Sequence, residues 1–112
     1  NILYINQFPD READIAAGKL HWVARLPVHR ARWGYVGFLL LAMAAIALPV
    51  ALGLLPRGVA LGLLAVVPAG IAARTLVREA ARSHALAPAI RSTIAAAHLV
   101  ALAMAIGLWW RP

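Results

Sequence analysis

Residues 33–56 read WGYVGFLLLAMAAIALPVALGLLP and contain no Asp, Glu, Lys or Arg. A helix that crosses the hydrocarbon core of a bilayer needs roughly 20 consecutive apolar residues, so this stretch is long enough for one crossing. Two further uncharged stretches follow it, at 58–73 and 92–110. The shorter one reaches spanning length if the side chain of Arg74 extends to the membrane surface and residues 75–77 continue the helix. We therefore predict three transmembrane helices, at about 33–55, 58–77 and 93–110.

The composition of the whole chain is also typical of a membrane protein. Of its 112 residues, 63% are hydrophobic and 13% are charged, and the mean hydropathy is +0.79. Soluble domains are about half apolar and a quarter charged. Disorder is excluded because it requires low hydrophobicity, and the lack of cysteine excludes a disulfide scaffold or a zinc site built on Cys. We expect an all-α integral membrane helical bundle.

The chain is expected to form a single membrane domain over residues 1–112. Within it, residues 1–32 are interpreted as the end of a helix followed by a polar, aspartate-rich loop, and residues 33–112 as a three-helix bundle. The first residues, Asn1-Ile2-Leu3-Tyr4-Ile5, lack the features of a signal peptide. They resemble the last turns of a helix that begins upstream, so we expect the chain to be a C-terminal fragment of a longer protein.

The basic residues predict how the chain lies in the membrane. Of the eleven Lys and Arg, nine precede the first predicted helix or lie between Arg74 and Arg91, whereas Arg57 and Arg111 lie on the other side. The positive-inside rule then places residues 9–32 and 78–92 in the cytoplasm. We expect an integral protein of the inner (cytoplasmic) membrane, with the aspartate-rich segment on the cytoplasmic side. Because the charges form no basic stripe with interleaved aromatics, no nucleic-acid partner is expected.

Several residues carry expectations about packing. Trp33 and Tyr35 are expected to anchor the first helix at the cytoplasmic interface, where Trp and Tyr are enriched. Residues 55–58 are expected to form a tight turn, and Pro88 predicts a break in the polar segment that follows the second helix. Gly58 and Gly62 form a small-xxx-small pattern, which favours close helix packing.

Three of the four acids lie close together, at Asp10, Glu12 and Asp14. On one continuous helix, Asn6, Asp10 and Asp14 would share a face because they are four residues apart. Two carboxylates on one face repel each other, and a divalent cation would relieve that repulsion. Mg²⁺ is typically held by one or two carboxylates together with substrate phosphate oxygens. The pattern therefore indicates a Mg²⁺ site at Asp10 and Asp14, with Lys19 as a positive charge for the same phosphate; the alternative is that the acids only solvate a loop.

Residues 6–19, NQFPDREADIAAGK, together with Val23-Ala24-Arg25-Leu26, resemble the second aspartate-rich motif of the UbiA superfamily of intramembrane prenyltransferases. The shared pattern is Asn-x3-Asp-x3-Asp, a short spacer, Gly-Lys, and an apolar-Arg-Leu segment. The closest likeness is to the branch that prenylates 1,4-dihydroxy-2-naphthoate in menaquinone synthesis. Members have nine helices with this motif after the sixth, so the chain would match the C-terminal part of that fold.

The chain departs from the family pattern in two places. Leu20-His21-Trp22 stands where the family usually has Thr-Leu, and Pro27 stands where a Gly often follows. Both departures leave the subfamily and the aromatic acceptor open. The first aspartate-rich motif of the family has no counterpart in this chain.

The resemblance implies a Mg²⁺-assisted transfer of an isoprenoid chain from an allylic polyprenyl diphosphate to an aromatic acceptor. Asp10 and Asp14 would be catalytic as metal ligands, and Asn6, Lys19 and Arg25 would bind substrate. The implied partners are the two substrates, the lipid bilayer, and the missing N-terminal helices, from the same chain or a partner subunit. Without the first motif, the fragment alone is expected to be inactive.

One alternative belongs to a different class of function. The chain could be a non-catalytic, three-span accessory subunit of a larger membrane complex. A transporter is less favoured, because the predicted spans contain no acid and no Lys.

Overall fold

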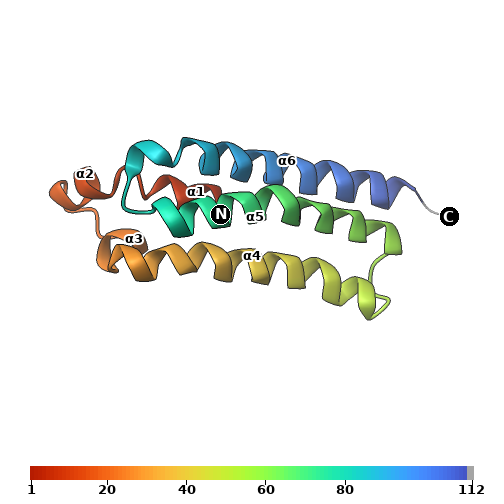
Figure 1. Cartoon of the computed structure of the whole chain (residues 1–112). Coiled ribbons are helices and arrows are strands. Elements are labelled where there is room, and N and C mark those ends of the chain that lie inside the picture. The colour runs from red at the N-terminus through yellow and green to blue at the C-terminus, as the bar shows by residue number, and fades with distance from the viewer. Residues whose placement is uncertain (111–112) are drawn as a thin grey trace.

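The computed structural model describes residues 1–110, and all regular elements in this range are helices. Three long helical segments lie side by side and antiparallel to their neighbours (Figure 1). They are α4 (Val28–Ala51), the continuous pair η1 (Arg57–Ala65) and α5 (Val66–Glu79), and α6 (Ala87–Trp109). These segments of 24, 23 and 23 residues are long and apolar enough to cross a membrane. The predicted all-α chain with three candidate spans is confirmed.

The first long helix begins and ends earlier than predicted. It begins directly after Pro27, whose carbonyl accepts the first helical bonds from Arg30 and Ala31. The helix therefore includes the charged residues before Trp33, where the predicted span began. It ends at Ala51 because Gly53 adopts a φ of +72°, a left-handed conformation that suits glycine at a helix C-terminus. The predicted tight turn exists, but it lies about three residues before the expected position.

The second predicted helix begins as a 3₁₀-helix, which the hydrophobic pattern did not predict. In a 3₁₀-helix residues three apart lie on the same face. Val59, Gly62 and Ala65 have this spacing, and they are the buried residues of η1. The α-helical winding begins at Val66 and continues past Arg74, as expected. The small and apolar residues at every third position thus match the tighter winding.

Close packing at Gly58 and Gly62 is confirmed. A Cβ on Gly58 would lie 2.9 Å from the Cα of Gly107 in α6, and a Cβ on Gly107 would collide with the carbonyl of Gly58. A Cβ on Gly62 would lie 2.7 Å from the Cγ of Met104. The backbones of η1 and α6 approach each other because these positions carry no side chain.

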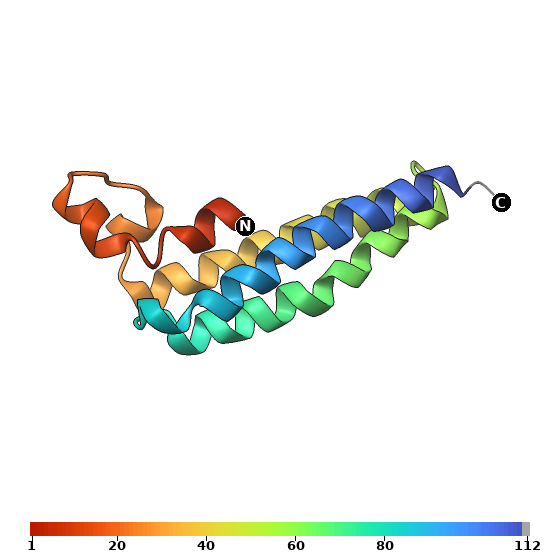
Figure 2. The same cartoon turned by 90° about the horizontal axis from the view of Figure 1, so that it is seen from above.

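Four short elements complete the chain: α1 (Ile2–Asn6), α2 (Arg11–Ala16), α3 (Trp22–Arg25) and η2 (Ser83–Ala85). Figure 2 shows α1 beside the long helices, with α2 and α3 beyond their end. Ile5 and Phe8 attach this region, because both are buried in one cluster with Tyr35, Leu76 and Leu86. The N-terminal segment therefore packs against the bundle rather than extending away from it.

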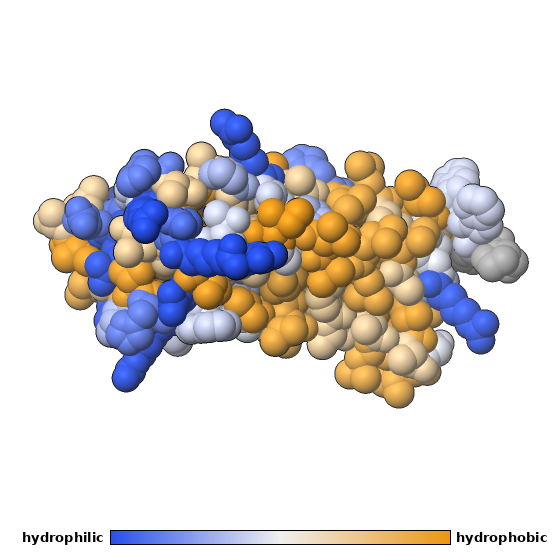
Figure 3. All heavy atoms as spheres, in the orientation of Figure 1, coloured by the Kyte–Doolittle hydropathy of each residue, from blue (hydrophilic) through white to orange (hydrophobic). Residues whose placement is uncertain are grey.

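Both polar segments, 7–27 and 80–86, lie at the same end of the bundle, which we call the polar end. The turn at 52–56 and the C-terminal end of α6 lie at the opposite end (Figure 1). Figure 3 shows hydrophilic residues gathered at the polar end and apolar residues over the long helices. The nine basic residues assigned to one side therefore share one end, whereas Arg111 lies outside the described residues. The three apolar helices suggest an integral membrane protein.

The expectation for Tyr35 is wrong. Its side chain is fully buried and its hydroxyl lies 2.8 Å from the Thr93 hydroxyl of α6, whereas Trp33 is 55% exposed. Residues two apart on an α-helix point to nearly opposite sides, because each residue turns the helix by about 100°. Only Trp33 is therefore placed as an interfacial anchor would be. Tyr35 instead ties α4 to α6.

We predict that Gly107→Ala destabilises the bundle, because the added Cβ forces η1 and α6 apart. Overpacking of a close contact costs about 1–3 kcal/mol. Thermal unfolding in detergent micelles, followed by circular dichroism, would show a lower Tm. Gly70→Ala is the matched control, since a Cβ there meets nothing within 4 Å and alanine favours a helix. Equal Tm values for the two variants would contradict the proposed contact.

Candidate functional site

The aspartate-rich segment is not one continuous helix. Asn6 ends α1, and α2 begins only at Arg11. Pro9 lies between them and has no amide hydrogen, so it cannot continue the helical bonding. The expectation that Asn6 shares a helix face with Asp10 and Asp14 is therefore wrong.

Asp10 and Asp14 keep the one-turn relation that the spacing predicts. Asp10 is the N-cap residue of α2, and its carbonyl accepts a bond of 2.8 Å from the amide of Asp14. Residues four apart on a helix are surface neighbours. The Asp10 side chain makes no capping hydrogen bond and is exposed to solvent. The two aspartates thus lie one helical turn apart, and the Asp10 side chain is open to solvent.

Asp14 is held by two side chains from the loop that follows α2. Its Oδ1 accepts a bond from Lys19 Nζ at 3.1 Å, and its Oδ2 lies 3.0 Å from His21 Nε2. Gly18 makes this possible, because its φ of +75° ends α2 and turns the chain back. The sequence pattern indicates Lys19 but not His21, whose separation of seven residues matches no helical pairing. The Gly-Lys pair after α2 was the available signal for such a turn.

His21 orients Asp14 and also begins the next helix. Its Nδ1 accepts a hydrogen bond of 3.2 Å from the amide of Ala24, which makes His21 the N-cap of α3. Since Nδ1 accepts, the neutral ring carries its hydrogen on Nε2 and donates it to Asp14. The His21 hydrogen bond, and next the Lys19 bond, lower the pKa of Asp14 below its ordinary value of 3.8. The arrangement keeps this carboxylate ionised.

Arg11 closes the loop between α2 and α3. Its Nε donates to the carbonyl of Val23 at 2.9 Å, and its Nη2 donates to the carbonyl of Leu26 at 3.3 Å. From the sequence, Arg11 counts only as one positive charge of the cytoplasmic side. In the structure, its guanidinium supports the loop that carries Lys19 and His21.

Two expected site residues, Asn6 and Arg25, lie at the same end but are not hydrogen bonded to Asp14 or its partners, whereas Lys19 is. Lys19 leaves 69% of its side chain exposed while it pairs with Asp14. Asn6 and Arg25 are exposed, and Arg25 lies in the last turn of α3. In the described part of the chain, neither one hydrogen bonds to Asp10, Asp14 or Lys19. We call Asp10, Asp14, Lys19 and His21 the Asp14 cluster.

The donor set fits a cation that is shared with a phosphate ligand. Within residues 1–110, no group of three or more His, Cys, Asp or Glu side chains could hold a metal ion. A carboxylate has about four acceptor positions, so Asp14 keeps capacity beside its bonds to Lys19 and His21. Mg²⁺ commonly binds one or two carboxylates and takes its other ligands from water and phosphate oxygens. Asp10 and Asp14 would be the carboxylates of such a site.

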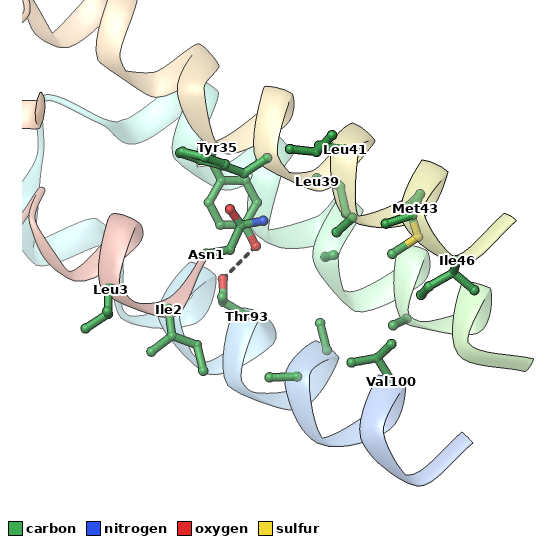
Figure 4. A pocket seen from close by; sticks show the side chains of 17 residues that line it. Asn1, Ile2, Leu3, Tyr35, Leu39, Leu41, Met43, Ile46, Thr93 and Val100 are labelled. Atoms are coloured by element: carbon green, nitrogen blue, oxygen red, sulfur yellow. Dashed lines mark hydrogen bonds between the residues drawn. The ribbon is translucent and has the colours of Figure 1, made fainter. Parts of the chain in front are cut away.

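An apolar cavity of about 530 Å³ opens between the long helices (Figure 4). Its walls come from α1, α4, α6 and the region around Ala65 and Ala69. The Tyr35–Thr93 hydrogen bond supplies polar groups in a lining that is otherwise mostly apolar, and Asn1 lines the same cavity. The first residues of α1 line this cavity, and the aspartate-rich segment follows α1 in the sequence.

Comparison of the chain with protein-family models, with curated proteins and with solved structures gave no match. Function is therefore inferred from the Asp14 cluster, the apolar cavity and the three candidate membrane spans.

We predict that the carboxyl carbon of Asp14, followed by NMR, titrates with a midpoint below 3.8. Because the pKa is lower in the folded chain, the stabilisation is complete above the ordinary value and is lost as the pH falls through the folded-state value. Lys19→Met should move the midpoint upward, and His21→Phe should move it further. An unchanged midpoint in both variants would contradict the contacts described above.

Proposed function

We propose that the chain is the diphosphate-binding part of a membrane prenyltransferase. The enzyme would transfer an isoprenoid chain from an allylic polyprenyl diphosphate to an aromatic acceptor of the naphthoate or quinone-precursor type. The observation that carries this proposal is the Asp14 cluster at the polar end of a bundle whose long helices border an apolar cavity. A polyprenyl diphosphate has the matching form, with a charged head group and an apolar tail.

In this proposal Asp10 and Asp14 hold Mg²⁺, which would act as a Lewis acid that stabilises the negative charge of the departing diphosphate. His21 keeps Asp14 ionised and oriented through its hydrogen bond. Lys19 is exposed enough to turn toward a phosphate while it remains next to Asp14. The allylic C–O bond breaks with its electron pair on the diphosphate, a ring carbon of the acceptor bonds to the allylic carbon, and the ring then loses a proton.

The apolar cavity has a part in the same proposal. An allylic cation reacts with water unless the site excludes it, and closed apolar surroundings suppress such side reactions. The cavity is lined by α4 and α6 side chains such as Leu39, Ile46 and Val100. These residues would hold the tail close to the head-group site.

The remaining support comes from the resemblance of residues 6–26 to the second motif of the UbiA superfamily. The three candidate spans that follow it agree with that family's nine-helix fold, with the chain as its C-terminal part. Asn6 and Arg25 enter the proposed substrate site on this ground. The first motif would come from other helices, of the same protein or of a partner subunit, on the cytoplasmic side of the inner membrane.

One observation favours the alternative of a non-catalytic accessory subunit. Both carboxylate oxygens of Asp14 are already bonded to side chains of this chain, as in a carboxylate that only supports a loop. Under that alternative, the cluster would bind no diphosphate whether or not Mg²⁺ is present.

We predict that the purified chain, in nanodiscs of neutral lipid, binds farnesyl diphosphate at least tenfold more tightly with Mg²⁺ than with EDTA. Charge-assisted hydrogen bonds contribute about 1.5–3 kcal/mol each, which corresponds to roughly ten- to hundredfold in affinity. Isothermal titration calorimetry would measure this difference. Asp10→Asn and Asp14→Asn should abolish the Mg²⁺ dependence, and Glu12→Gln is the matched control. No binding with or without Mg²⁺ would favour the accessory subunit, and equal loss in all three variants would contradict the role of Asp10 and Asp14.

We also predict that the chain alone transfers no prenyl group, because Asp10 and Asp14 supply only part of the metal site. The measurement is the formation of prenylated 1,4-dihydroxy-2-naphthoate from farnesyl diphosphate, with Mg²⁺ present. Detectable product from residues 1–112 alone would show that the first aspartate-rich motif is not required.

A further inference from the structure

A second cavity, of about 370 Å³, opens at the polar end between α1, α3 and α4. Five of its residues lie on one face of α4, at spacings of a single helical stripe, namely Arg30, Gly34, Gly37, Phe38 and Leu41. Because Gly37 has no side chain, a groove stays open along this stripe, with Tyr4 packed over Gly34. Arg30 is one end of the groove and Leu41 is the other.

The wall of this groove is held in place. The hydroxyl of Tyr4 donates a hydrogen bond of 2.6 Å to the carbonyl of Ala31, and its ring packs edge-on against Phe38 at 5.4 Å. Tyr4 covers Gly34, where an added Cβ would lie 2.6 Å from its ring carbon Cζ. At Gly37 nothing lies within 4 Å of an added Cβ, so the groove is open there. Tyr4 is thus a fixed part of the groove wall, held by its hydrogen bond to Ala31 and its contact with Phe38.

The ends of the groove differ in polarity. Arg30 is exposed, and Trp22, which is 75% exposed, lies at the same end. Exposed Trp and Arg side chains at a helix end are typical of a membrane–water interface. Among the ion pairs of the described residues, none involves Arg30. The guanidinium is therefore available to an anion at the membrane surface.

The length of the groove matches one leaflet of a bilayer. Arg30 and Leu41 are eleven residues apart, which corresponds to about 16 Å along an α-helix. Half of the hydrocarbon core is about 15 Å. An acyl chain that begins at the surface beside Arg30 would end near Leu41, so the groove fits a lipid of the leaflet on that side.

We propose that this groove binds one acyl chain of an anionic phospholipid, whose phosphate pairs with Arg30. The proposal does not depend on the proposed prenyl transfer, because none of its residues belongs to the Asp14 cluster. The charge of the site complements the anionic surface of a cytoplasmic leaflet, which attracts basic residues near the membrane. An acyl chain can lie directly against the α4 backbone at Gly37, because nothing lies within 4 Å of an added Cβ there.

Native mass spectrometry of the purified chain, released from micelles that contain equal amounts of phosphatidylglycerol and phosphatidylcholine, tests the proposal. The unmodified chain is expected to retain one phosphatidylglycerol in preference to phosphatidylcholine. Arg30→Gln should reduce this preference about fivefold, since one basic residue near the surface contributes about 1 kcal/mol. Arg57→Gln, at the opposite end of the bundle, should leave it unchanged.

Gly37→Leu tests the apolar part of the groove. The leucine side chain would occupy the space of about two methylene groups of the acyl chain, which predicts a roughly tenfold lower retention of lipid. Gly70→Leu is the control, because its Cβ is equally unobstructed and Gly70 does not line the groove. Circular dichroism would verify that all variants keep their helix content. Arg30→Gln keeps the proposal testable if Gly37→Leu fails to fold.

Three results would overturn the proposal. Retention that is unchanged in both Arg30→Gln and Gly37→Leu would show that lipid binds elsewhere. Displacement of phosphatidylglycerol by farnesyl diphosphate, but not by inorganic phosphate, would assign the groove to the isoprenoid substrate. A dimer that Gly37→Leu disrupts, without any change in bound lipid, would assign the groove to a second copy of the chain.

Discussion

In an apolar environment a backbone amide or carbonyl must find its hydrogen-bond partner within the protein, and this constraint accounts for most of the structure. Three long helices satisfy it along their length. Breaks in the backbone bonding occur where the long helices end, at 52–56 and 80–86, and in the polar stretch before α4. The two longer polar segments, 7–27 and 80–86, lie together at the polar end.

A few polar contacts fix how the helices and the loop before α4 are held together. Arg32 donates from α4 to the carbonyl of Val77 near the end of α5, and Tyr35 meets Thr93 between α4 and α6. Arg11 and His21 act in the same way on the loop, because each uses its side chain to satisfy backbone groups of α3 and its flanks. The Asp14 cluster depends on both. The Asp14 cluster thus forms where loop backbone and side chains have to be held without a large apolar core.

The three spans, their common polar end and the glycine contact were predictable from the sequence, because they follow from long uncharged runs, charge placement and small-residue spacing. Helix ends were less predictable, because Pro27 and Gly53 decide them locally. The inward position of Tyr35 and the 3₁₀ winding of η1 depend on what lies opposite each residue. At the site, the Asp10–Asp14 pair was visible as helical spacing. His21 and Arg11 were not, since the turn at Gly18 brings together residues that no periodic pattern relates.

The central claim is that Asp10 and Asp14 bind a divalent cation together with a diphosphate. Mn²⁺ in place of Mg²⁺ makes this directly measurable by electron–nuclear double resonance, which detects ³¹P nuclei bonded through oxygen to the metal. With carboxyl-¹³C-labelled aspartate in the chain, the account predicts that ³¹P and ¹³C couplings appear together when farnesyl diphosphate and Mn²⁺ are added. The ¹³C coupling should vanish in the Asp10→Asn, Asp14→Asn double variant. A ³¹P coupling without any ¹³C coupling, as for the metal–diphosphate complex free in solution, would contradict the account.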